Sequence, residues 1–506
     1  MPALATMPAS RPYQQLLEQL RQASLLSATS SLLAWDQETY MPSGCGERRA
    51  DQLELMAKLA HEQATAPIVG ELLSECQGAA TNDDAQAASI REIQRDYDRA
   101  TKLPSTLIAE LAATESRAQQ AWVAARSKSS FADFQPWLEK VVSLQQQKAD
   151  CLKQSDQSRW DALADIYEPG MRAKTLQDLF VPLRQRLVQL RQRLESGKQP
   201  DDTFKHREVA EPQQASLVHA IVAGMGFDFS RGRIDRSAHP FCTSIAGDVR
   251  LTTRFHKDNV LDAIGSTMHE GGHGLYEQGL PTEHFGSPLG EAVSLGIHES
   301  QSRLWENHVG RSQSFWNWCW PHAKSHLGQA CDGQNAESIY ALANLVAPSL
   351  IRVEADEATY DLHVMVRFEI EQALISGEIA VADLPTRWNE LYLEYLGVTV
   401  PDDSRGCLQD VHWSCGLFGY FPTYTLGNLY AAQFAHKADQ DLNGLDALIQ
   451  IGDFTPLREW LRENVHQHGR RYSPAELCER ATGTPLSSEH FTNYLERKLQ
   501  HVYEVS

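Results

Sequence analysis

Near the middle of this 506-residue sequence lies the segment Met268-His269-Glu270-Gly271-Gly272-His273-Gly274. Residues four apart on a helix project from the same face, so both imidazoles can reach a single metal ion. Glu270 would lie close enough to that face for its carboxylate to contact a water molecule on the metal. The His-Glu-x-x-His pattern therefore predicts a helix that carries two metal ligands and a glutamate base.

The residues around this segment favour a helix. Apolar side chains recur at helical spacing on a face turned away from the histidines, at Leu261, Ile264, Met268 and Leu275. Asn259 or Asp262 could cap the start of the helix, and Gly279 followed by Pro281 could end it.

Glycines are unusually frequent in this helix, at Gly265, Gly271, Gly272 and Gly274. Each costs about 1 kcal/mol relative to alanine in a helix interior. Close approach of another backbone or of a substrate is the natural compensation. The glycines therefore favour a functional helix over a chance pair of surface histidines.

A zinc hydrolase site needs a third protein ligand and one position left open for water. Glu291 and Glu299 are the main carboxylates at suitable separations. A helix returning antiparallel after the intervening loop could place Glu299 opposite both histidines, so we favour it over Glu291. We expect Glu277, one turn after His273, to support the site or to lie on the surface.

The first ~230 residues show helical periodicity throughout. We predict helices at Tyr13–Ala34, Glu47–Ala66, Ala85–Thr101, Leu107–Ser127, Phe134–Gln154, Leu176–Leu194 and Gln213–Met225. Turn-forming residues separate several of them, at Met41–Gly44, Ala80–Asp84, Pro104 and Lys128–Ser130. The clearest strand is Val249–Phe255, after a predicted turn at Ser244–Asp248. With no Pro/Ser-rich linker, the pattern indicates one mainly α-helical domain with a small β-sheet.

Charge and composition exclude some classes of partner. Lys plus Arg is 46 and Asp plus Glu is 66, so the net charge of -20 disfavours nucleic acid and anionic membranes. Met1–Pro12 has no basic patch followed by an apolar run, so we expect no secretory signal. Nine scattered cysteines, an odd number, then favour reduced thiols and a cytoplasmic location. Cys407 and Cys415 flank His412, but small buried hydrophobic side chains explain them better than a second metal site.

Several further motifs occur in a fixed order along the chain. They are Ala34–Pro42, His239-Pro240-Phe241, Asp248–Thr252, His269–His273, His298–Gln301, Ile351–Asp356 and Gly406–Trp413. Together they resemble the Taq-type carboxypeptidases, a family of zinc metallocarboxypeptidases, over nearly the whole chain.

The resemblance implies more than the residues alone. It implies that Glu299, rather than Glu291, completes the metal site with His269 and His273. It implies a mainly α fold with a deep active-site groove, similar to neurolysin and angiotensin-converting enzyme. The single catalytic peptidase domain, 1–506, would divide into helical groove walls, 1–230, and a metal- and substrate-binding region, 231–506. A homodimer that trims peptides with a free C-terminus, with broad side-chain tolerance, is also implied.

The expected chemistry is metal-assisted peptide hydrolysis, with zinc as the ion and Co²⁺ or Mn²⁺ as possible substitutes. Glu270 would take a proton from the attacking water and give it to the leaving amine. His412 and a tyrosine, Tyr420 or Tyr424, are the candidates to stabilise the oxyanion. We favour Tyr420 slightly.

An arginine should bind the free carboxylate of the substrate. Arg352 is the first candidate and Arg250 the second. Ion pairs with acidic residues, at Asp248, Asp356 or Glu357, are the structural alternative for both arginines. His239, before Pro240, is a further candidate for substrate binding; it could be a ligand, but we favour a role in fixing a loop near the site. Asp356 and Glu354 are candidate partners for the metal-binding histidines.

Two other functions remain open from the sequence. An oligopeptidase or dipeptidyl carboxypeptidase would use the same metal chemistry on a different bond. A helical scaffold with a vestigial metal site would not need Glu270.

Overall fold

The computed structural model describes residues 11–78 and 83–505. The N-terminal segment up to residue 10, which includes most of Met1–Pro12, lies outside the described residues, and so does most of the predicted break at Ala80–Asp84. Among the described helices, none is both long and apolar enough to cross a membrane.

The predicted helices of the first half are confirmed within a few residues. They are α1 (Arg11–Thr39), α2 (Gly46–Ala64), α4 (Asp84–Lys102), α5 (Ser105–Lys128), α6 (Phe131–Leu152), α8 (Ala173–Leu194) and α9 (Glu211–Met225). Two further helices, α3 (Pro67–Gly78) and α7 (Arg159–Ala164), were not predicted from the sequence. Proline is compatible with the first turn of a helix, where its missing N–H has no partner to lose, so Pro67 begins α3 rather than breaking it.

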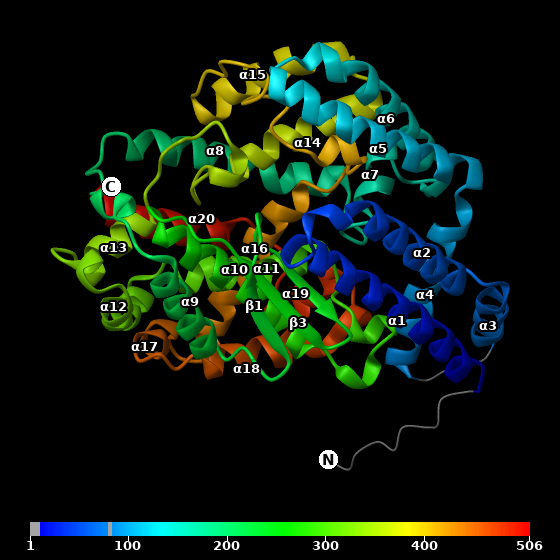
Figure 1. The fold of residues 1–506 in the computed structure, drawn as a ribbon, viewed down its shortest axis with the longest axis horizontal. Helices are drawn as coiled ribbons and strands as arrows, with labels where there is room; N and C mark the ends of the chain where they lie inside the picture. The colour runs from blue at the N-terminus through cyan, green and yellow to red at the C-terminus, as the bar shows by residue number, and fades with distance from the viewer. Residues whose placement is uncertain (1–10, 79–82, 506) are drawn as a thin grey trace.

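A three-stranded sheet lies near the centre of the molecule, with α1 beside it (Figure 1). Its strands are β1 (Gly232–Arg236), β2 (Cys242–Ile245) and β3 (Asp248–Thr253), in the order β1-β3-β2. β3 runs parallel to β1 and antiparallel to β2.

The predicted turn and strand are both present in this sheet. Ala246 and Gly247, with φ of 52° and 95°, form a tight turn between β2 and β3. Positive φ at both central positions suits the right-handed twist of the paired strands. The strand ends at Thr253, two residues before its predicted end at Phe255. β1 and β2 were not predicted, because their short, mostly half-buried sequences carry little pattern.

The second half is again helical. Its longer helices are α10 (Val260–Gly279), α11 (Leu295–Arg303), α12 (Gln313–Leu327), α13 (Ala336–Ala343), α14 (Tyr360–Ser376), α15 (Leu384–Leu396), α16 (Pro422–Asp441), α18 (Thr455–Asn464), α19 (Pro474–Thr482) and α20 (Glu489–Tyr503), with the short α17 (Leu445–Gln450). A π-helical segment, η5 (Leu304–Val309), continues directly from α11.

One continuous hydrophobic core extends from Ala118 to Tyr503, on both sides of residue 230. A separate small cluster joins α1, α3 and α4, through side chains such as Leu16, Leu73 and Ile93. By contrast, α2 has no buried residue along its 19 positions. The centre of the molecule is therefore densely packed, and the α1–α2 pair lies at its edge.

Candidate metal centre

The predicted helix is α10, and its ends lie where the sequence placed them. The Asn259 side chain accepts a hydrogen bond from the Asp262 backbone N–H at 3.3 Å, and the helix ends at Gly279. Ile264, Met268 and Leu275 are buried on the side of the core. Burial of that face leaves the two histidines to project toward the neighbouring helix α11.

His269, His273 and Glu299 lie together. The Glu299 Oε2 atom is 3.7 Å from Nε2 of His269 and 3.5 Å from Nε2 of His273. Two donors on one tetrahedral zinc ion are about 3.4 Å apart, given metal–ligand distances of about 2.1 Å. Within the part of the chain that the structure describes, this is the one group of three or more His, Cys, Asp or Glu side chains close enough to hold an ion. The donor set therefore fits zinc.

Glu291 and Glu277 have other partners. Glu291 Oε2 is 3.0 Å from Nη1 of Arg470. Glu277 contacts His298, with Oε1 2.9 Å from Nε2, and the His298 ring stacks on His273 at a centroid distance of 4.5 Å. Glu277 thus supports the ring beside a candidate ligand, as expected from its position one turn after His273.

Glycines, which have no side chain, allow α10 and α11 to approach each other closely. A Cβ atom on Gly272 would lie 2.5 Å from the Gln301 carbonyl oxygen and 2.7 Å from the Ser302 Cα. On the other side, a Cβ atom on Gly427 of α16 would lie 2.7 Å from the Cβ of Glu299. The predicted close backbone approach is confirmed at Gly272, whereas a Cβ on Gly265 would meet nothing within 4 Å.

The partner of the His269 ring is Glu306, not Asp356 or Glu354. Nδ1 of His269 is 2.9 Å from Oε2 of Glu306. Asp356 instead accepts hydrogen bonds from the backbone of Ala347 and from Thr359, and Glu354 is exposed. The prediction of Asp356 and Glu354 was therefore wrong, because both lie in a turn whose own backbone engages Asp356.

Arg303 joins the two carboxylates of the site. Its Nε donates to Glu299 Oε1 at 2.6 Å and its Nη1 to Glu306 Oε2 at 3.3 Å. Neither Arg303 nor Glu306 was predicted from the sequence. Arg303 follows Glu299 by four residues, and Glu306 follows Arg303 by three. This is the spacing of oppositely charged pairs on one helix face, and it could have identified both residues from the sequence.

Burial shifts the titration of the central groups. It raises the pKa of Glu270, which is 7% exposed, to about 7. It lowers the pKa of His273 to about 4, so this ring is neutral and can offer a lone pair to a cation. A carboxyl group with a pKa near neutrality can both accept and return a proton.

His412 lies beside both candidate tyrosines. Its Nε2 is 3.4 Å from the hydroxyl of Tyr424, and its ring centroid is 5.4 Å from that of Tyr420. Burial raises the pKa of both hydroxyls, which keeps them protonated and able to donate. Tyr424 lies in the first turn of α16, the helix that touches Glu299 at Gly427, so the aromatic group adjoins the metal cluster.

Arg352 is buried in a polar cluster. Its Nε donates to Asp410 Oδ1 at 3.1 Å, and its Nη1 to the hydroxyl of Tyr360 at 3.1 Å. Arg367 also donates to Asp410, from Nε at 2.8 Å and Nη2 at 2.6 Å. Two guanidinium groups thus share one carboxylate, which leaves one positive charge in excess beside Tyr424. The carboxylate that pairs with Arg352 is thus Asp410, and not one of the three considered from the sequence, Asp248, Asp356 and Glu357.

Arg250 and His239 lie at the sheet. Nη2 of Arg250 is 2.6 Å from Asp248 Oδ2, and its guanidinium stacks on the Trp35 ring of α1 at 4.1 Å. His239 is exposed, and its carbonyl accepts a hydrogen bond from Ser237 Oγ at 2.5 Å. Of the ion pairs considered from the sequence, the one with Asp248 is present for Arg250.

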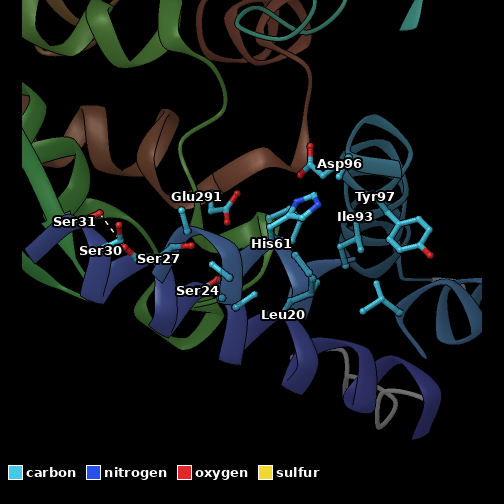
Figure 2. A pocket seen from close by; sticks show the side chains of 18 of the residues that line it. Leu20, Ser24, Ser27, Ser30, Ser31, His61, Ile93, Asp96, Tyr97 and Glu291 are labelled. Atoms are coloured by element: carbon cyan, nitrogen blue, oxygen red, sulfur yellow. Dashed lines mark hydrogen bonds between the residues drawn. The ribbon is translucent and has the colours of Figure 1, made fainter. Parts of the chain in front are cut away.

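Two cavities flank these elements. One of about 670 Å³ lies between α1, α2, α4 and the loop before Glu291, and Figure 2 shows serines of α1 along it with Glu291 and Asp96 nearby. It contains none of the three metal-site candidates. The other, about 230 Å³, runs along α10 past Gly265 and is lined by Glu306 and Arg311.

Comparisons with known proteins match the chain over almost its full length. The family model described as carboxypeptidase Taq (M32) metallopeptidase matches residues 15–499. Thermostable carboxypeptidase 1 of Thermus thermophilus is 44% identical, over 97% of this chain and 99% of its own. Carboxypeptidase 1 of Bacillus subtilis is 36% identical, over 97% and 98%. The crystal structure of the M32 carboxypeptidase from Deinococcus radiodurans superposes with a TM-score of 0.96 at 39% identity, over 98% of this chain and 100% of that one.

Proposed function

The chain belongs to the carboxypeptidase Taq (M32) family of metallopeptidases, and from this premise we propose that it releases residues of varied type from peptide C-termini with zinc held by His269, His273 and Glu299. The observation that carries the proposal is the convergence of these three side chains, with donor atoms within 4.8 Å of one another. A metallocarboxypeptidase requires such a site. Two imidazoles and one carboxylate suit zinc and leave a coordination position open.

When bound, zinc supplies Lewis-acid chemistry, polarising the scissile carbonyl and lowering the pKa of a water molecule. Glu270 takes the proton from the attacking water and later delivers it to the leaving amine. Its burial and its place between the two histidines support this role. Its raised pKa is consistent with both steps.

The aromatic group beside the metal cluster stabilises the developing oxyanion in this proposal. His412 and one of Tyr420 and Tyr424 supply protonated donors that are already oriented by their mutual contacts. Preorganised donors need no rearrangement when charge develops in the transition state. The Tyr424 hydroxyl is engaged with His412, which leaves Tyr420 as the favoured donor to substrate.

Arg352 is the proposed anchor of the substrate carboxylate. The positive charge that Arg352 and Arg367 hold in excess over Asp410 would be neutralised by a carboxylate of the substrate. Arg250 is the weaker candidate, because one carboxylate, Asp248, already balances its single charge. We assign His239 to the support of the loop before β2.

The remaining proposals concern the domain organisation and the oligomeric state of the protein. We propose one catalytic domain, in which residues 1–230 wall a groove and 231–506 bind metal and substrate; the continuous core across residue 230 supports it. We also propose a homodimer. Exposed apolar side chains on α1 and α2, at Leu25, Leu32, Leu55 and Leu59, would be covered by a second copy. Light scattering would measure the mass directly.

A matched pair of peptides tests the function. The zinc-loaded protein should release the last residue from a peptide with a free C-terminus and leave the same peptide with an amidated C-terminus intact. Glu270→Gln should retain zinc and lose cleavage by about a thousandfold. Cleavage of the amidated peptide would instead indicate an oligopeptidase, and release of dipeptides would indicate a dipeptidyl carboxypeptidase. Full activity of Glu270→Gln would show that Glu270 has no part in the mechanism.

A further inference from the structure

The π-helical segment η5, Leu304–Val309, directly follows the helix that carries Glu299. π-Helical turns are rare and are frequently found at functional sites. Glu306 lies in this segment and contacts Nδ1 of His269, across from the Nε2 atom that faces Glu299. The deviation from α-helical geometry thus occurs at the residue that supports a candidate ligand.

The C-terminal helix α20 holds η5 from the other side. The hydroxyl of Tyr494 donates to the Asn307 carbonyl oxygen at 2.8 Å. The Tyr494 ring also lies against His308, with a centroid distance of 4.0 Å. A π-helix leaves backbone carbonyls in need of partners, and this hydroxyl supplies one.

Tyr494 is itself fixed by a buried ion pair. Nζ of Lys498 donates to the Tyr494 hydroxyl at 2.6 Å and pairs with Glu357, and both charged residues are 8% exposed. With the lysine as donor, the Tyr494 hydroxyl keeps its own proton, and both the Asn307 carbonyl oxygen and the Glu357 carboxylate face that proton. A continuous set of contacts therefore connects α20 through η5 to His269.

We propose that Glu306 and Tyr494 are positioning residues for the metal ligand His269, with η5 as the element that connects them. This inference rests on the proposed metal site. Glu306 fixes the orientation of the imidazole and holds the proton on Nδ1, so that Nε2 presents its lone pair. Tyr494, which approaches no candidate ligand itself, fixes the backbone from which Glu306 projects.

Zinc affinity is the direct readout, measured on metal-free protein by competition with a chromophoric chelator. Glu306→Gln should weaken zinc binding about 10- to 100-fold, the usual effect of removing a carboxylate that supports a histidine ligand. Tyr494→Phe should weaken it about threefold to tenfold, the equivalent of one hydrogen bond.

Tyr503→Phe is the matched control, because Tyr503 lies on the same helix, is buried, and accepts a hydrogen bond from the Val346 backbone N–H at 2.6 Å. It should leave zinc affinity within twofold of wild type. Thermal unfolding of the metal-free variants separates folding from binding: Tyr494→Phe and Tyr503→Phe should lose similar stability and differ only in zinc affinity. The visible absorption of the Co²⁺-substituted protein should change in Glu306→Gln and Tyr494→Phe but not in Tyr503→Phe.

The outcomes distinguish a failure of this inference from a failure of the proposed metal site on which it rests. If wild-type protein binds no stoichiometric zinc, or His269→Ala binds it as tightly as wild type, the proposed metal site fails. If wild type binds zinc and His269→Ala does not, but Glu306→Gln and Tyr494→Phe bind as well as Tyr503→Phe, the positioning role is overturned. Equal losses of affinity in Tyr494→Phe and Tyr503→Phe would also overturn it, because they would reflect stability alone.

Discussion

Gly272→Ala tests whether the contact between α10 and α11 sets the metal geometry. The added Cβ would lie 2.5 Å and 2.7 Å from two backbone atoms of α11, where real Cβ contacts essentially never fall below 3.0 Å. The two helices must therefore separate by about 0.5 Å or more, which exceeds the tolerance of a preorganised site. Because His269 and His273 lie on one helix and Glu299 on the other, we expect zinc affinity to fall at least tenfold.

The effect on stability follows from two opposing contributions. Overpacking costs about 1–3 kcal/mol, and replacing a helical glycine by alanine returns about 1 kcal/mol. The net loss should be about 1 kcal/mol. Gly265→Ala, in the same helix with nothing within 4 Å of its Cβ, is the control and should gain about 1 kcal/mol.

Urea unfolding of the metal-free proteins and zinc competition would measure both quantities. The two variants should differ by about 2 kcal/mol in free energy of unfolding, and only Gly272→Ala should bind zinc more weakly. If Gly272→Ala matched Gly265→Ala in both measurements, the helix contact would not determine the site, and the explanation given for the glycines would be refuted.

Three further predictions concern pH, catalysis and the metal. Burial raises the pKa of Glu168, which accepts hydrogen bonds from Gly296 N–H and the Tyr430 hydroxyl, to about 7. The pKa of Glu168 is higher in the folded state than in the unfolded state, so its contribution to folding stability, about 3 kcal/mol, is present below pH ~4.5 and lost as pH rises through about 7. The urea midpoint of Glu168→Gln should therefore fall less than that of wild type between pH 5 and 7.5. Parallel curves for the two proteins would contradict this. Tyr420→Phe should lower kcat about 100-fold in steady-state kinetics, the effect of removing one oxyanion donor, and Tyr424→Phe should lower it less; the reverse order would assign the donor role to Tyr424. Chelation should abolish cleavage and lower the unfolding temperature, and zinc should restore both; an unchanged unfolding temperature would mean that the folded state gains nothing from the ion.

Local patterns predicted the helix of the metal site well. The cap at Asn259, the end at Gly279 and the i, i+4 histidines depend only on residues within a few turns of one another. Glu299 was favoured by its place in a second helical pattern, and the resemblance to a family removed the alternative Glu291. The helix is confirmed, because helical spacing determines which residues share a face, and the structure brings Glu299 within 3.7 Å of both histidine rings. The role of Glu299 as a metal ligand stays a prediction.

Contacts between distant segments could not be predicted in this way. Asp410 lies 58 residues after Arg352, and nothing in the spacing of either residue identifies the pair. Glu306 is a different case: its spacing from Arg303 was a usable signal, but nothing in the sequence marks the π-helical turn in which Glu306 contacts His269. The pairing of β1 with β3 likewise depends on packing rather than on alternation within β1.

The lack of buried residues in α2 has a consequence for how the molecule opens. Detaching α2 from α1 would break the hydrogen bonds from Arg49 to the Leu33 carbonyl oxygen and to Asp36, but would uncover no side chain of α2 that is buried. The free energy of that local opening should be far below the free energy of global unfolding. Backbone amides of α2 should accordingly exchange with solvent deuterium long before those of α10, while the histidines and Glu299 stay assembled.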